Sequence, residues 1–184
     1  MDKTAVAKAA LNVERAIAAI EVLKATEDRR AFQNAWSDFL SASHRVFAKL
    51  EQGAKVSAPS KVWFGKKIHQ RRTDPLLSYI HHARNLDEHG LEHSAHAENK
   101  LGKPEIVRVA DVGPHQSTLR SIIMQPVLAD TAATKLFPVT DRDVTYNPPV
   151  EHLGKPIADL SAVGIAELAI SYLRAMTAEA VQLP

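Results

Sequence analysis

Hydrophobic positions in the first half of the chain recur every three to four residues, the spacing of an amphipathic helix. Residues 4–25 are rich in strong helix formers and contain no glycine or proline, which predicts a first helix. A second helix is predicted from residue 27 or 28 to residue 50, with Gly53 placed to end it. One side of this helix carries a stripe typical of core packing: Phe32, Trp36, Phe39, Leu40, Ser43, Phe47 and Leu50.

Residues 61–73 form a basic segment that contains aromatic side chains and no acidic residue. Ser60 is predicted to cap a short helical or irregular piece there. Cations bind phosphates and flat rings stack on bases, so this segment is a candidate surface for single-stranded nucleic acid. Its predicted nucleic-acid-binding residues are Lys66, Lys67, Arg71 and Arg72. A solvated connector whose Trp63 and Phe64 cover the core explains the same pattern.

The central stretch begins with Asp74-Pro75, a strong helix start, because Asp can cap free backbone N–H groups and Pro is tolerated at the first helical position. The helix is predicted to end near Gly90 or to continue to about Ala97. An apolar stripe occupies one face: Leu76, Leu77, Ile80 and Ala83. Polar residues at three-to-four spacing occupy another face: His82, Asn85, His89 and His93. One face is therefore predicted to pack, and the other is available for chemistry.

The pattern changes after Gly102 and Pro104. Residues 105–112, 118–124 and 135–146 are rich in β-branched residues and are punctuated by prolines, which predicts two or three antiparallel strands. Asp159 is then predicted to cap a last helix over residues 160–181. The apolar residues of this helix cover nearly its full circumference, so we expect it to pack centrally against the earlier helices.

These elements predict one mostly α domain spanning residues 1–184. Its core is an up-and-down bundle of four to five helices, formed by residues 1–100 and 158–184. A small antiparallel β insertion, residues 104–150, precedes the last helix. Such a short, proline-rich set of strands is expected to be an embellishment of the bundle and not an independent barrel.

Composition narrows the possible chemistry. The chain has no cysteine, which excludes disulfides, thiol nucleophiles and cysteine-based metal sites. No stretch reaches the roughly 20 apolar residues that span a bilayer, and the first residues do not resemble a signal peptide. We therefore expect a cytoplasmic protein without membrane contact. The net charge is only +2, so any nucleic-acid binding would require a local basic patch.

Five of the nine histidines fall within residues 74–96. Among them, Arg84 and Asn85 are followed by three residues and then His89, and this Arg-Asn-x-x-x-His motif resembles the active-site motif of the HEPN family. The resemblance implies a helical bundle, pairing of two protomers around one cleft and, in active members, metal-independent RNA cleavage. It makes Arg84 the phosphate clamp, His89 the general acid/base and Asn85 the orienting residue. The β insertion and Gly90 depart from the minimal family pattern.

The residue types suit this reaction, because imidazole exchanges protons near neutral pH and guanidinium binds phosphate through a fork of donors. On an ideal helix, positions 84 and 89 lie roughly 140° apart, so both reach one cleft only if it faces the arc between them. The alternative is structural: Arg84 pairs with Asp87 or Glu88, and His89 interacts with the helix C-terminus.

Metal binding is a second interpretation of the same stretch. Residues 89–93 formally match His-x-x-Glu-His, a zinc-binding pattern, although Gly90 weakens the helix that this spacing requires. In that pattern the two histidines bind zinc and the glutamate, Glu92, activates water; in a weaker form of the interpretation, His89, His93 and His96 bind zinc or nickel without catalysis. The sequence contains no glycine-rich phosphate loop, Gly-x-Ser-x-Gly elbow or dinucleotide fingerprint.

We therefore expect a homodimeric, RNA-directed, metal-independent endoribonuclease with Arg84, Asn85 and His89 in its site and no metal or other cofactor. The alternative is a non-enzymatic helical interaction or binding protein, which could bind metal through its histidine cluster. Asp141 and Asp143 are interpreted as the edge of a hairpin, and His44, His69, His115 and His152 as structural or surface residues.

Overall fold

The computed structural model describes residues 1–89, 95–97 and 134–184. Within these residues the fold is the predicted helical bundle, with short antiparallel strands before the last helix. The predicted strands at residues 105–112 and 118–124, and the candidate metal ligand His93, lie outside the described residues.

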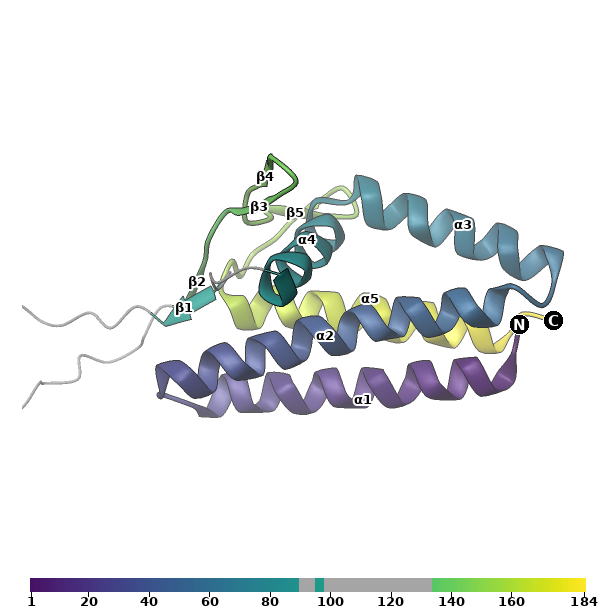
Figure 1. The fold of residues 1–184 in the computed structure, drawn as a ribbon, viewed down its shortest axis with the longest axis horizontal. Coiled ribbons are helices and arrows are strands. Elements are labelled where there is room, and N and C mark those ends of the chain that lie inside the picture. The colour runs from purple at the N-terminus through teal and green to yellow at the C-terminus, as the bar shows by residue number, and fades with distance from the viewer. Residues whose placement is uncertain (90–94, 98–133) are drawn as a thin grey trace, which may run out of the picture.

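Three long helices form the body of the bundle (Figure 1). They are α1 (Lys3–Ala25), α2 (Arg29–Ala54) and α5 (Ala162–Val181). The helix α3 (Ala58–Thr73) runs back along the bundle, and α4 (Pro75–His89) crosses between α3 and the β segment. Both chain termini lie at the same end of the molecule (Figure 1).

Side-chain caps define where these helices begin. The carboxylates of Asp2, Asp28 and Asp74 accept hydrogen bonds from the backbone N–H three residues later, at 2.6, 2.7 and 2.9 Å. The hydroxyl of Ser161 does the same for α5, and Asp159 accepts a bond from the backbone N–H of Ser161. The predicted Asp74 cap is therefore confirmed. The predicted Asp159 cap of the last helix is wrong, because Ser161 caps α5, which starts two residues later than predicted.

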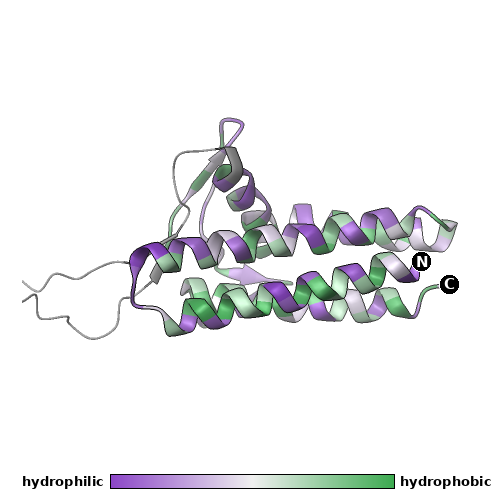
Figure 2. Cartoon of the chain, turned by 60° about the horizontal axis from the view of Figure 1, so that its bottom comes forward, coloured by the Kyte–Doolittle hydropathy of each residue, from purple (hydrophilic) through white to green (hydrophobic). Residues whose placement is uncertain are grey.

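The aromatic stripe predicted on α2 is core. Phe32, Trp36, Phe39 and Leu40 are at most 1% exposed, which agrees with packing and not with a ligand-binding face. The last helix packs against α1, α2 and α4, as its apolar circumference predicted. Figure 2 shows how hydrophobic and hydrophilic positions share the surface of each helix.

The helix α3 corrects the prediction of a short or irregular piece capped by Ser60. It has 16 residues, and Ser57 is its N-cap. Pro59 lies in the first turn, where its missing N–H costs nothing, and the Ser57 hydroxyl accepts a bond from the Ser60 N–H. Ser60 is buried beside that cap, and its hydroxyl bonds to Ser57 Oγ at 2.8 Å.

The strands in the described part of the chain form three two-stranded antiparallel sheets. They pair β1 (Ala95–Ala97) with β2 (Thr134–Leu136), β3 (Val139–Asp141) with β4 (Val144–Tyr146), and β5 (Glu151–His152) with β6 (Lys155–Pro156). Strands are confirmed within the predicted range 135–146. However, β1 excludes a helix that continues to Ala97, and β5 and β6 lie beyond the predicted limit of the insertion at residue 150.

The hairpin β3–β4 is packed directly on α4. Val139 is fully buried, and the Tyr79 hydroxyl of α4 donates to the Phe137 carbonyl oxygen at 2.7 Å. Arg142 and Asp143 form the turn with φ values of 51° and 63°, the left-handed pair that a two-residue hairpin requires. This geometry places Asp141, the last residue of β3, against the polar side of α4.

Candidate functional site

The helix α4 separates packing residues from polar residues, as its pattern predicted. Its apolar stripe is buried, with Leu76 and Ala83 at 0% exposure. Four polar residues of α4 are half-buried beside this stripe: His81, His82, Arg84 and Asn85. This polar side meets two different surroundings, the β3–β4 hairpin and a pocket between helices.

Against the hairpin, four side chains form a hairpin cluster: His82, Asn85, Asp141 and Tyr146. Asp141 Oδ2 accepts a hydrogen bond from Asn85 Nδ2 at 2.8 Å and lies 2.8 Å from His82 Nδ1. The His82 ring stacks on Tyr146 with 3.6 Å between ring centroids and 11° between planes. A carboxylate on Nδ1 and a stacked ring fix the imidazole in one orientation and leave Nε2 as the nitrogen for proton exchange.

The charge of this cluster favours that arrangement. The hydrogen bonds from Asn85 and His82 lower the pKa of Asp141, so the carboxylate stays ionised at neutral pH. An ionised carboxylate holds the His82 tautomer that presents Nε2 and stabilises the imidazolium formed when His82 takes a proton. His82 is 21% exposed and therefore remains within reach of a solvent-borne substrate.

The residues of the Arg-Asn-x-x-x-His motif continue from this cluster. Asn85 belongs to it, and Arg84 Nη1 donates to Asn85 Oδ1 at 3.5 Å. His89 is the last residue of α4. Seven residues separate it from His82, so both positions fall on nearly the same helix face, roughly 10 Å apart along the axis.

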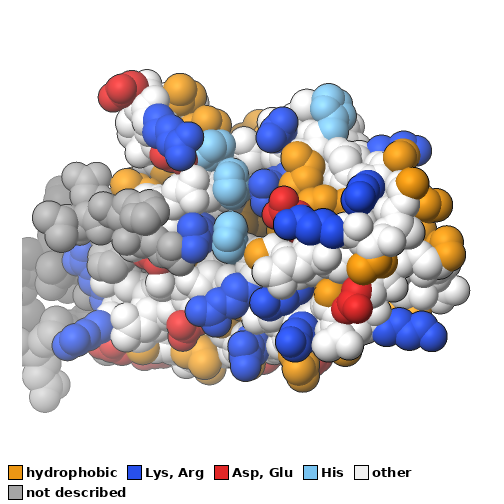
Figure 3. Space-filling view, turned by 45° about the vertical axis from the view of Figure 1, so that its right-hand side comes forward, with side chains coloured by type: hydrophobic (Ala, Val, Ile, Leu, Met, Phe, Trp, Pro, Cys, Tyr) orange, Lys and Arg blue, Asp and Glu red, His pale blue; other side chains and the backbone are white. Residues whose placement is uncertain are grey.

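A second group, the histidine row, consists of His44 on α2 with His81 and His82 on α4. The rings of His44 and His81 are stacked with centroids 6.3 Å apart, and His81 meets His82 edge to face at 5.0 Å. Figure 3 shows a column of histidine side chains on this face of the molecule, with lysine and arginine side chains beside it.

The inner end of the row lines the four-helix pocket, which lies among α2, α3, α4 and α5. Its polar lining is Ser43, His44, Arg71 and His81, and the rest of its lining is apolar. Burial, followed by the positive charge of Arg71, lowers the pKa of His81 to about 4. His81 is therefore a neutral imidazole at pH 7 beside a permanent cation.

The four residues predicted to bind nucleic acid fall into two groups, one exposed and one pointing inward. Lys66 and Arg72 are exposed on α3. Lys67 points inward, where its side chain is 11% exposed and pairs with Glu179 at 2.7 Å, and Arg71 lies over the Phe47 ring at 4.9 Å. These four residues do not form one continuous exposed surface.

The aromatic residues of the same segment belong partly to the core. Phe64 is buried, and the Trp63 indole N–H donates to Glu179 at 2.9 Å. These contacts agree with the connector interpretation for the two rings.

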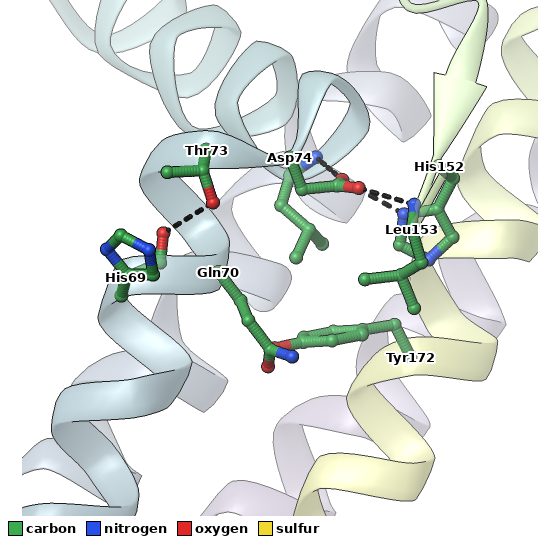
Figure 4. Close-up of polar contacts among 8 residues, drawn as sticks. His69, Gln70, Thr73, Asp74, His152, Leu153 and Tyr172 are labelled. Carbon is green, nitrogen blue, oxygen red and sulfur yellow. Dashed lines mark hydrogen bonds and ion pairs between the residues drawn. The ribbon is translucent and has the colours of Figure 1, made fainter. Parts of the chain in front are cut away.

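A second aspartate–histidine pair joins the start of α4 to β5 (Figure 4). Asp74 Oδ1 lies 2.9 Å from His152 Nδ1, and Asp74 Oδ2 accepts a bond from the Leu153 N–H at 2.7 Å. Nearby, the Tyr172 hydroxyl donates to Gln70 at 3.0 Å, and burial raises the pKa of Tyr172 to about 12. His152 is thus a structural residue, as predicted.

Sequence reasoning missed two contributors to this face. Asp141 was assigned only to a hairpin edge, and His44 only to structure or surface. The hairpin is correct, but its last strand residue before the turn contacts α4, 56 residues earlier in the chain. The one available signal was the acidic turn Asp141-Arg142-Asp143 in a chain whose histidines gather on a single helix.

No group of three or more metal-ligating side chains occurs in the part of the chain that the structure describes. Over the same residues, no helix has the length and apolar character needed to cross a membrane. Comparison with protein-family models, with curated proteins and with solved structures found no match for this chain. The function must therefore be argued from the geometry of the site.

Proposed function

We propose that this protein is a metal-independent endoribonuclease whose reacting groups lie on the polar side of α4. The observation that carries the proposal is the His82–Asp141 pair, an imidazole held at 2.8 Å by a carboxylate that also binds Asn85, whose amide oxygen accepts a bond from Arg84. The resemblance of the Arg-Asn-x-x-x-His motif to the HEPN family supports the same function. A cytoplasmic location is consistent with this role.

RNA can cleave itself when its 2′-oxygen attacks the adjacent phosphorus and the 5′-oxygen leaves. The reaction needs a base for the 2′-hydroxyl proton, an acid for the leaving oxygen and a cation for the phosphate. His82 takes the first proton through Nε2, while Asp141 stabilises the resulting imidazolium. His89 supplies the second proton, and Arg84 binds the phosphate, positioned by Asn85.

Pairing of two protomers belongs to this proposal. It would bring a second Arg84 and a second His89 to a shared cleft. Covalent cross-linking and sedimentation of the purified protein test the pairing independently of cleavage. If the protein cleaves RNA as a monomer, the proposed chemistry stands and the proposed shared cleft is wrong.

The test is RNA cleavage by the purified protein in excess chelator. We expect wild-type cleavage to resist the chelator and to fall about 100-fold or more in Arg84→Ala, His89→Ala and His82→Ala, because general acid–base catalysis contributes a factor of this size. His69→Ala is the matched control, since His69 is an exposed histidine on α3. Circular dichroism of each variant separates lost chemistry from lost fold.

Three other outcomes contradict the proposal. Cleavage that disappears with chelator assigns the activity to a metal. Equal cleavage by wild type and by all three histidine and arginine variants places the reaction elsewhere. No cleavage of a mixed pool of structured and unstructured RNA favours the non-enzymatic binding protein.

That second candidate is favoured by one observation. Asp141 on the hairpin binds both Asn85 and His82 on α4. The same two contacts would suit a cluster whose role is to hold the hairpin on α4. Retained RNA binding without cleavage would assign the cluster to this structural role.

A further inference from the structure

We propose that the four-helix pocket is a binding site for a small oxyanion, and that a phosphate group is its ligand. The pocket is lined by helices and not by the hairpin, and it lies on the His81 side of α4. Its ligand is bound by groups outside the Arg-Asn-x-x-x-His motif, so the proposal does not depend on RNA cleavage.

The first argument is the charge of Arg71. Its side chain enters the pocket over Phe47, and its Nε is buried without a hydrogen-bond partner among the described residues. Burial lowers its pKa, and Glu51 offsets this only by a longer-range charge interaction. Since arginine cannot lose its proton in a protein, a bound anion is the direct way to stabilise this guanidinium.

The second feature that favours a ligand is the buried hydroxyl of Ser43. This residue is 3% exposed, it lines the pocket, and its Oγ has no hydrogen-bond partner in the described part of the chain. Buried hydroxyl groups are almost always hydrogen-bonded, because an unpaired one has lost its bonds to water without replacement. A ligand oxygen within the pocket would satisfy it.

The third argument is the composition of the lining. Beside Arg71 and Ser43 stand the imidazoles of His44 and His81, which can donate N–H bonds, and no acidic residue lines the pocket. The remaining lining is apolar: Leu40, Phe47, Leu77, Ile80, Ala169 and Leu173. A positive, donor-rich pocket with apolar walls selects an anion and excludes a cation, and the guanidinium fork matches phosphate oxygens.

A bound anion would also change the titration of His81. Burial lowers the pKa of His81 most, the charges of Arg71, His82 and His44 lower it further, and Asp141 raises it. A phosphate near Arg71 offsets the positive charge, so the pKa of His81 should rise on binding by about 1. This shift is a readout that a merely structural pocket would not produce.

The experiment follows the ring proton signals of His44 and His81 by NMR in the full-length protein. Inorganic phosphate is the probe, added at constant ionic strength against chloride. We expect saturable shifts of both signals and the rise of the His81 pKa. Shifts that chloride reproduces, or that never saturate, overturn the proposal.

Matched variants assign the site. Arg71→Gln keeps much of the side-chain length but removes the charge, and we expect phosphate to bind at least about tenfold more weakly. Arg45→Gln removes the same charge from an exposed residue of α2 outside the pocket lining and should leave binding unchanged. Ser43→Ala should weaken binding severalfold, which keeps the test decisive if Arg71→Gln unfolds. Equal binding by Arg71→Gln, or by Ser43→Ala where Arg71→Gln does not fold, overturns the site.

The source of the phosphate is resolved by a second titration with a short RNA oligonucleotide. Competition between this RNA and inorganic phosphate for the His81 signal assigns the pocket to a backbone phosphate of RNA. A response to inorganic phosphate alone assigns it to a free anion. Because this readout needs no cleavage, failure of the pocket and failure of the proposed nuclease are distinguishable.

Discussion

Two aspartate–histidine pairs connect α4 to the β segment, and they differ in what else holds the carboxylate. Asp74 bonds to two backbone N–H groups, those of Leu77 and Leu153, as well as to His152. Among the described residues, the Asp141 carboxylate bonds only to side chains, those of Asn85 and His82. The side chains of the first pair are 5% and 12% exposed, against 15% and 21% for the second.

The difference teaches how to separate a structural pair from a candidate catalytic pair of the same length. Backbone N–H groups cannot leave their position without distorting the fold, so Asp74 is fixed in one role. Side chains can turn and exchange protons at small cost, so Asp141 and His82 can serve a reaction. The contact distances, 2.9 and 2.8 Å, do not distinguish the two pairs.

The largest expected effect is on the structural pair. Asp74→Ala removes the cap of α4 and leaves the backbone N–H groups of Leu77 and Leu153 without their partner. We expect the free energy of unfolding to fall by about 3 kcal/mol, which combines a lost cap with a buried unpaired donor. Denaturant unfolding measures this change.

Asp28→Ala is the matched control, because Asp28 caps α2 from an exposed position. Its cost should be about 1 kcal/mol. If both alanine variants cost the same, Asp74 is an ordinary cap and the comparison between the two pairs fails.

The second expected effect is a loss of stability at acidic pH, and it arises from His81, which belongs to neither aspartate–histidine pair. The pKa of His81 is lowered from 6.5 to about 4 in the folded protein. The unfolded chain therefore binds more protons between these two values, and stability falls as the pH falls through this window. After allowance for partial exposure, the loss is on the order of 1–2 kcal/mol.

At lower pH, the dependence of stability on pH is set by Asp141. Its folded pKa lies below 3.8, so the stability it contributes is present above that pH and is lost as the pH falls further. The free energy of unfolding is measured from pH 7 to pH 3. Its decrease between pH 6.5 and about 4 should disappear in His81→Gln, and its decrease below pH 3.8 should disappear in Asp141→Asn. A profile unchanged in His81→Gln would show that this histidine titrates normally.

Local patterns of the sequence predicted most of the bundle. The first helix was expected over residues 4–25 and is Lys3–Ala25, and Asp74 caps α4 as expected. These elements depend on neighbours three or four residues apart, which periodicity and capping preferences record. The buried stripe of α2 follows from the same rule.

Of the candidate site, the sequence predicted the residues on α4 but not their partners. The histidine-rich face of α4 is local and was recognised, but its partners come from distant segments. Asp141 follows Asn85 by 56 residues, and His44 reaches the row from α2. The inward turn of Arg71 likewise depends on the packing of α3 against Phe47, which charge counting along one helix does not reveal.

The smallest effect on stability is expected for the second pair, and it is the most informative. Asp141→Asn removes the charge of a partly exposed pair but keeps an oxygen that can accept the bond from Asn85. We expect less than about 1 kcal/mol of lost stability, the range for partly exposed ion pairs, and about tenfold slower RNA cleavage because His82 loses its carboxylate. Unfolding and chelator-resistant cleavage measure the two quantities.

Asp143→Asn is the matched control, because Asp143 is an exposed residue of the same turn with a φ of 63°, a conformation that Asn also tolerates. It should leave both stability and cleavage unchanged. Equal cleavage by Asp141→Asn and Asp143→Asn would reduce Asp141 to a hairpin residue and remove the functional half of the comparison. Lost stability near that of Asp74→Ala would make both pairs structural, because only a pair built into the fold can cost so much when it is broken.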